Sequence, residues 1–340
     1  MRYGKPWLPL GDQIDRLERR GIDIGDRARA ERLLCEVGYY RLTGYLHPFR
    51  AVDPAIGYLP GTHVSHAAAL IDFDRRLRLL VLDALERIEV SLRMRVGYVL
   101  GEVSAFAHRD AQTFMPEFTR RPEHAADRTI ATLLPPELSL SKHDVWLVKV
   151  AERQSRSSEN FVQHFREKYA NEMPIWALTE ILELGQLVTL YRGLNTRLSQ
   201  AIADAYGVPT KKLFLSWLAT LNYVRNVAAH HARLYNRKLV TAPKRPAPSR
   251  VPLLAHLSDS ALPKEYGLYS ALAVAQYLLL AVDPESSWGA ELARLLSEFP
   301  AAGPVAVSSL GVPEGWETMP LWAGPRSSRE PLPTSEVTSC

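Results

Sequence analysis

Apolar residues recur at helical spacing from about residue 10 to residue 240, and this periodicity constrains the fold more than any other feature of the chain. No segment in that range shows the alternation of apolar and polar residues that marks a half-buried strand. The longest uninterrupted helical pattern covers 72–101, with Asp72 as its expected N-cap and Gly101 near its end. We therefore predict an all-α fold organised around one long central helix.

Shorter stretches with the same periodicity predict the helices around the central one. Near the N-terminus, 10–20 and 26–37 predict a helical hairpin, whereas 38–50, with two glycines, four aromatic residues and a proline, predicts a packed connection. Four prolines between 105 and 142 predict a long irregular segment with short helices. Further helices are expected over 145–170, 175–194, 197–206, 213–237, 266–282 and 288–299.

The predicted central helix carries charged residues on one side. At 100° per residue, Asp74, Arg78, Glu86, Glu89 and Arg93 fall within an arc of about 120°. The pairs Asp74–Arg78 and Glu89–Arg93 have the i,i+4 spacing of intrahelical ion pairs. Two interpretations stay open: the arc is a solvated, ion-paired face, or it supports a buried polar site.

Composition limits the class of protein. A chain of 340 residues that is 46% hydrophobic and 23% charged is typical of a soluble globular protein with one large domain or two ordinary ones. Two cysteines, Cys35 and Cys340, provide neither a disulfide framework nor a zinc-binding spacing, and they fit a reducing cytosol. No signal region or membrane-length apolar run is present, so we expect a cytoplasmic protein without a membrane partner. The net charge of +4 favours a phosphate-bearing partner.

The stretch NYVRNVAAHHARLYNR, residues 222–237, concentrates arginine, asparagine and histidine. If 213–237 form one helix, five side chains share a stripe about 80° wide: Asn222, Asn226, His230, Arg233 and Arg237. His231 falls on the opposite, apolar arc, where we expect a packed and hydrogen-bonded ring. Arg225 lies about 140° from His230, so the two do not share a face of an ideal helix. A helix end, or a second subunit across a two-fold axis, would bring them together.

Arginine, asparagine and histidine together suit RNA cleavage. Histidine transfers protons near neutral pH, and arginine stabilises charge that develops on a phosphoryl group. The RNA 2′-hydroxyl would attack the adjacent phosphorus, with His230 as base or acid and Arg225 holding the charge, and would leave a cyclic phosphate and a 5′-hydroxyl. This chemistry needs no metal or other cofactor, and we expect none, because adjacent histidines point to different faces of a helix. Spacing alone leaves open a catalytic site or a solvated helix face.

The pattern R-N-x-x-x-H at residues 225–230 resembles the signature of HEPN domains, which are helical bundles that are commonly metal-independent ribonucleases. Further stretches make the chain similar to the Abi family of bacterial abortive-infection proteins, the AbiD/AbiF-like group. These stretches are KPWLPLGDQIDRLERRGI with GYYRLTGYLHPFR, FDRRLRLLVLDALERIEVSLR, FREKYANEMPIWALTEILELGQLVTLY and LGVPEGWETMPLW. In order and spacing they cover roughly residues 4–322.

The resemblance implies a HEPN-like helical bundle, a homodimer whose two motifs meet at one composite site, and an endoribonuclease that acts as a conditional toxin during phage infection. It implies that Arg225 and His230 are the catalytic pair and that Asn226 is their polar partner. It also supplies candidates for shaping the site or contacting RNA, namely His231, Arg233, Asn236, Arg237, Glu89 and Arg93. An RNA or protein antitoxin is a further partner that the resemblance leaves open.

The family-length match predicts four regions. They are an N-terminal helical region at 1–60, a HEPN-like core at 61–242, a C-terminal helical extension at 243–322 and a tail at 323–340, whose richness in proline, serine, threonine and glutamate predicts disorder. Two rival functions stay open beside the ribonuclease: a non-catalytic RNA-binding module, and a dimeric interaction module in phage defence whose polar stripe is a subunit contact.

Overall fold

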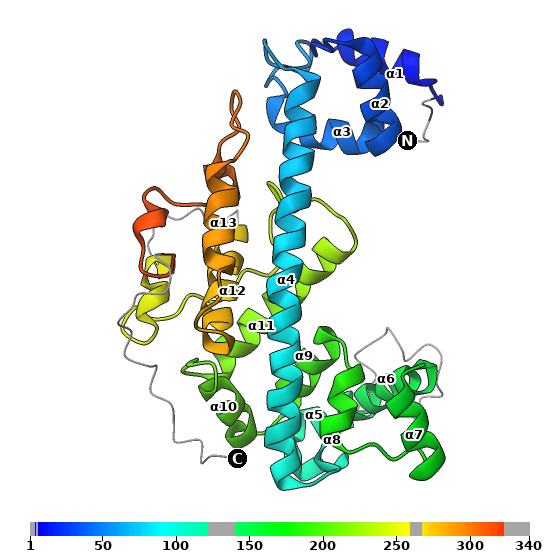
Figure 1. The fold of residues 1–340 in the computed structure, drawn as a ribbon, viewed down its shortest axis with the longest axis vertical. Helices are drawn as coiled ribbons and strands as arrows, with labels where there is room; N and C mark the ends of the chain where they lie inside the picture. Colours follow the sequence, from blue (N-terminus) through cyan, green and yellow to red (C-terminus); the bar gives the residue numbers. More distant parts are fainter. Residues whose placement is uncertain (1–3, 5, 122–139, 259–266, 323–340) are drawn as a thin grey trace.

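One long helix, α4, runs along the longest axis of the molecule (Figure 1). The computed structural model describes residues 4, 6–121, 140–258 and 267–322, so the predicted disordered tail at 323–340 lies outside the described residues. Helix α4 spans Val64–Val103 and is about 60 Å long. All regular elements of the described chain are helices, and its β-type contacts are isolated bridges, which confirms the all-α prediction.

The start of α4 differs from the predicted N-cap at Asp72. The N-cap is instead His63, whose ring nitrogen Nδ1 accepts a hydrogen bond from the Ser65 amide at 2.9 Å. Val64 and Leu70 are buried and continue the apolar face upstream of Asp72 at helical spacing. The aspartate looks like a cap in the sequence, but it lies within the helix and pairs with a neighbouring arginine on its exposed side.

Three helices form a unit at the N-terminal end of α4 (Figure 1). The hairpin of α1 (Leu10–Glu18) and α2 (Arg27–Val37) is present as predicted. The stretch 38–50, predicted as a packed connection that breaks the helical pattern, instead forms α3 (Tyr39–Tyr45) and a short 3-10 helix, η1 (His47–Phe49). Gly38, with a φ of 76°, ends α2 and lets α3 begin at the next residue in a new direction.

Short helices gather at the opposite end of α4 (Figure 1). Two of the predicted helices are interrupted there. The pattern over 145–170 breaks at 157–159, and the pattern over 175–194 breaks at 182–183, where Leu182 and Glu183 adopt extended backbone angles. The elements of this end are η2 (Ala107–Arg109), η3 (Ala111–Thr113), α5 (Pro116–Thr119), α6 (Lys142–Arg156), α7 (Asn160–Lys168), α8 (Ile175–Leu178) and η5 (Thr179–Ile181).

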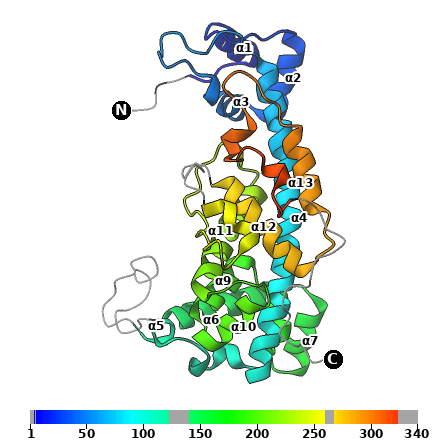
Figure 2. The same ribbon diagram turned by 90° about the vertical axis from the view of Figure 1, so that its left-hand side faces the viewer.

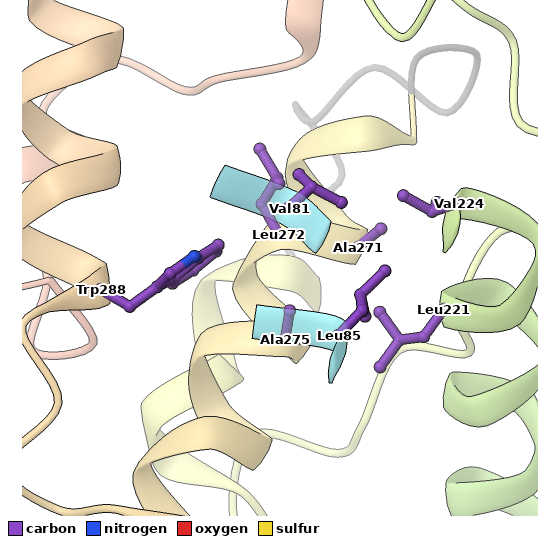
Figure 3. Close-up of a pocket in the computed structure, with 8 residues that line it drawn as sticks. All are labelled: Val81, Leu85, Leu221, Val224, Ala271, Leu272, Ala275 and Trp288. Atoms are coloured by element: carbon purple, nitrogen blue, oxygen red, sulfur yellow. The ribbon is translucent and has the colours of Figure 1, made fainter. Parts of the chain in front are cut away.

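Five helices cover the middle of α4 and complete the core (Figure 2). They are α9 (Leu184–Gly193), α10 (Thr196–Asp204), α11 (Lys211–Ala229), α12 (Leu268–Val282) and α13 (Trp288–Ser297). Figure 3 shows where α4, α11, α12 and α13 meet around a small apolar cavity of about 10 Å³. This volume is at the lower limit for one water molecule, so the cavity is a packing gap with no room for a ligand.

The chain after α11 packs back onto the same core. It contains η6 (Pro252–Ser258), η7 (Val307–Leu310) and η8 (Trp316–Thr318) beside α12 and α13. The Trp322 indole donates a hydrogen bond of 3.0 Å to the hydroxyl of Tyr269 on α12. Buried side chains from Ile14 to Trp322 form one continuous cluster, and the region boundaries near residues 60 and 242 stay predictions. No helix among the described residues combines the length and apolarity that crossing a membrane requires.

Candidate functional site

Helix α11 carries the first half of the polar motif and lies against α4. Thr210 caps its N-terminus by accepting a hydrogen bond of 3.2 Å from the Leu213 amide. Apolar residues such as Phe214, Trp217 and Leu221 bury one face of α11 against α4, α9 and α12. The Arg225 and Asn226 side chains at the other end of this helix are half-buried.

The helix ends at Ala229, which corrects the single helix predicted over 213–237. The amide of His231 donates to the Ala228 carbonyl, and the amide of Ala232 donates to the Val227 carbonyl, both at 3.0 Å. These two bonds form a Schellman motif, the common C-terminal lock of an α-helix. The shared polar stripe predicted for this helix therefore does not extend past His230.

His231 occupies the left-handed position of that motif, with a φ of 55°. Glycine is the usual residue there, and another L-residue pays about 1 kcal/mol for the close approach of its Cβ. The chain leaves the helix direction at this point, so His231 does not reach the apolar arc. The predicted packed ring is wrong, because both His230 and His231 are exposed.

A buried carboxylate from α4 lies between two arginines. Glu89 accepts a hydrogen bond of 2.6 Å from Arg93, and its second oxygen lies 3.9 Å from Nε of Arg225. The side chains of Glu89 and Arg225 are 9% and 32% exposed. Two guanidinium groups thus face one carboxylate in a partly desolvated place, and the excess positive charge suits a phosphate group.

Asn226 and His230 extend this cluster toward the surface. The Asn226 side-chain oxygen accepts a hydrogen bond of 3.3 Å from Arg225. The His230 amide donates to the Asn226 carbonyl at 3.0 Å, so the two residues lie one helical turn apart. Within the described chain, Arg225 makes no hydrogen bond or ion pair with His230, in agreement with the angular separation on the helix.

The turn after α11 is tied to α4 by Asp74, which is fully buried. Its carboxylate accepts hydrogen bonds from the amide of Tyr235 at 2.7 Å and from the amide of Leu234 at 3.2 Å. The same carboxylate accepts a hydrogen bond of 2.5 Å from the Tyr45 hydroxyl and is paired with Arg78. Burial and the Asp74 charge raise the pKa of the Tyr45 hydroxyl, which keeps it protonated as the donor.

The three remaining candidates, Arg233, Asn236 and Arg237, belong to this turn. Arg233 donates to the Gly44 carbonyl, and its guanidinium lies 5.7 Å from the centre of the Tyr45 ring. Arg237 donates to the Arg233 carbonyl at 2.7 Å. Asn236 has a φ of 48°, a left-handed conformation that asparagine tolerates. The two guanidinium groups therefore brace the turn from within.

The charged arc of α4 is only partly a solvated face. Asp74, Arg78 and Glu89 are buried, whereas Glu86 is exposed. Of the two interpretations of the arc, a buried polar site therefore fits Asp74, Arg78 and Glu89. Tyr45 and the Gly44 carbonyl could not be predicted from the sequence, because contacts between segments almost 190 residues apart leave no spacing signal. Among the described residues, no group of three or more histidine, cysteine, aspartate or glutamate side chains could hold a metal ion.

The comparison with protein families gives a match. Residues 32–236, more than half of the chain, match the family model described as Abi-like protein. The matched range begins in α2 and ends in the turn after α11, so it contains the Glu89 cluster, His230 and the Asp74 contacts. The comparisons with curated proteins and with solved structures gave no match.

Proposed function

Since the chain belongs to the Abi-like protein family, we propose that it acts in abortive infection as a metal-independent endoribonuclease of the HEPN type. Membership of this family supports a role in phage defence. The observation that supports the ribonuclease is the cluster in which Glu89 holds Arg225 and Arg93, one to two helical turns from the exposed His230. A cytoplasmic location is part of this proposal, because the proposed substrate is cellular RNA.

The proposed reaction uses these groups as follows. A histidine ring removes the proton of a 2′-hydroxyl, the 2′-oxygen attacks the adjacent phosphorus, and the bond from phosphorus to the 5′-oxygen breaks. A second proton donor protonates the leaving oxygen, so the products are a 2′,3′-cyclic phosphate and a 5′-hydroxyl. Arg225 stabilises the extra charge on the phosphoryl oxygens, and Glu89 holds its guanidinium in place.

The proposed site includes a second copy of the chain. Arg225 lies beside Glu89, and no hydrogen bond or ion pair joins it to His230 within the described chain, which favours a site that a second copy completes. In a two-fold dimer, each half of the shared cleft would combine Arg225 of one protomer with the His230 ring of its partner. We accordingly propose a homodimer as the active form.

Cleavage of a labelled RNA by the purified protein in excess EDTA tests this function. We expect cleavage by the wild type, loss of more than 100-fold with His230→Ala or Arg225→Ala, and unchanged helical content. His164→Ala on α7 and Arg197→Ala on α10 are matched controls, because both side chains are exposed and distant along the chain. Full activity of the two site variants would overturn the assignment. RNA binding without any product would instead indicate the non-catalytic RNA-binding module.

A further inference from the structure

Asp74 is an unusual residue for the middle of a buried helix face. The side chain is 0% exposed, yet it carries a carboxylate in the N-terminal half of α4. Leu70, Leu77 and Val81 surround it on the same face of the helix. A buried carboxylate is costly unless hydrogen bonds and an opposite charge satisfy it.

Four donors satisfy the Asp74 carboxylate, and two of them are backbone amides of the turn after α11. The amides belong to Leu234 and Tyr235, and the other donors are Tyr45 and Arg78. An apolar side chain could fill the core at this position equally well, since buried ion pairs are often replaceable by apolar groups. It could not hold two backbone amides. The particular effect of Asp74 is therefore on the turn.

Helix α3 holds the same turn from another side. Arg233 donates to the Gly44 carbonyl and lies over the Tyr45 ring, while the Tyr45 hydroxyl reaches Asp74. Tyr45 thus contacts Arg233 of the turn through its ring and Asp74 through its hydroxyl. These contacts link the N-terminal unit of α1, α2 and α3 to the residues that directly follow His230 and His231.

We propose that Asp74 and Tyr45 are positioning residues that fix the turn at 231–237 and thereby the direction in which His230 and His231 leave α11. Both side chains are buried, so in this proposal they act through the turn and not through contact with RNA. The N-terminal unit is then part of the site's support, and its displacement would release the histidines. The proposal rests on the proposed ribonuclease function for its effect on catalysis, but the anchoring of the turn is measurable without any activity.

Hydrogen exchange measured by mass spectrometry tests the anchor in the full-length protein. Tyr45→Phe removes one hydroxyl, and Asp74→Asn removes the charge while it keeps an acceptor. Tyr98→Phe and Asp83→Asn are matched controls on exposed positions of α4. We expect exchange at the amides of Leu234 and Tyr235 to accelerate about tenfold in the two anchor variants and to stay unchanged in the controls.

Steady-state cleavage of RNA by the same four variants tests the effect on catalysis. We expect kcat to fall at least tenfold for Tyr45→Phe and Asp74→Asn, with KM changed less than twofold, because no RNA contact is removed. A purely structural role would lower the fraction of active protein, which active-site titration detects, without altering kcat per folded molecule. If Asp74→Asn does not fold, Tyr45→Phe, which keeps the Asp74 carboxylate, decides whether the two residues have a positioning role.

The outcomes separate the two proposals. Accelerated exchange confined to the turn together with a lower kcat supports the positioning role. Unchanged exchange, or accelerated exchange with wild-type kcat, overturns it. If the wild type does not cut RNA, the proposed function fails, and the exchange result alone then decides whether Asp74 and Tyr45 anchor the turn.

Discussion

The Glu89 carboxylate of α4 contacts Arg93 through one oxygen and lies 3.9 Å from Arg225 of α11 through the other. This relationship joins the central helix to the motif helix and determines where the Arg225 guanidinium lies. The Glu89 side chain is 9% exposed and lies between two cations, so its carboxylate is satisfied only while both arginines are present.

We predict that Glu89→Gln lowers RNA cleavage at least tenfold and reduces the free energy of unfolding by about 1–3 kcal/mol. The neutral amide keeps the shape but leaves Arg93 and Arg225 without their counter-charge. Urea denaturation and the cleavage assay measure the two effects. Glu86→Gln, three residues away on an exposed position of the same helix, is the control, and we expect it to change stability by less than about 0.5 kcal/mol.

His231→Gly should raise the free energy of unfolding by about 1 kcal/mol. Glycine adopts the left-handed conformation of this position without the Cβ clash that the histidine tolerates. His230→Gly should not stabilise the protein, because the φ of −84° at His230 suits any residue. Chemical denaturation of both variants measures the difference. Equal stability changes in the two would show that His231 is not strained.

The stability of the fold should decline on acidification from pH 6.5 to pH 4, in part because of His108 near the far end of α4. Burial, with smaller effects of Arg109 and His143, lowers the pKa of His108 to about 4. The unfolded state, with an ordinary pKa near 6.5, therefore binds more protons between these values, so stability is fully present above pH 6.5 and falls below it. Protonation of His108 over this range is expected to lower the free energy of unfolding by about 3 kcal/mol in total.

His108→Phe should flatten this dependence. Unfolding measured at several pH values from 4 to 7 should show a slope lower by up to one proton in the variant. His164→Phe, an exposed histidine on α7, serves as the control and should keep the wild-type slope. An unchanged slope in His108→Phe would mean that this ring is protonated in the folded protein.

Mixing two inactive variants tests whether the site is shared between protomers. In an equal mixture of Arg225→Ala and His230→Ala, half of the dimers are mixed, and a site that needs Arg225 of one copy and His230 of the other is intact once in each. We expect about a quarter of the wild-type activity after subunit exchange. Complete inactivity of the mixture would place both groups of each site in one copy.

The helical content of the chain could be predicted from periodicity, whereas the contacts of Asp74 and Tyr45 that hold the turn after α11 could not. The hairpin of α1 and α2 and the helices α12 and α13 agree with the predicted ranges closely, because their apolar faces are uninterrupted. The end of α11 escaped prediction, since neither glycine nor proline marks it and the left-handed residue is a histidine.

The burial of Asp74 can be predicted only from a helical projection that includes the apolar residues of α4. Grouped with charged residues alone, it looks like part of a solvated stripe. Together with Leu70, Leu85 and Leu92, which are all buried, it lies near the centre of the apolar arc. Its partners Leu234 and Tyr235 are 160 residues away, and no local pattern connects them to it.

The most direct measurement is sequencing of RNA ends from cells after induced expression of the wild type, His230→Ala or Arg225→Ala. We predict growth arrest with new RNA ends that carry a 2′,3′-cyclic phosphate on one fragment and a 5′-hydroxyl on the other, in the wild type alone. The same ends and the same arrest in both variants, or arrest by the wild type without new RNA ends, would contradict the assignment of Arg225 and His230 as the catalytic pair of a ribonuclease.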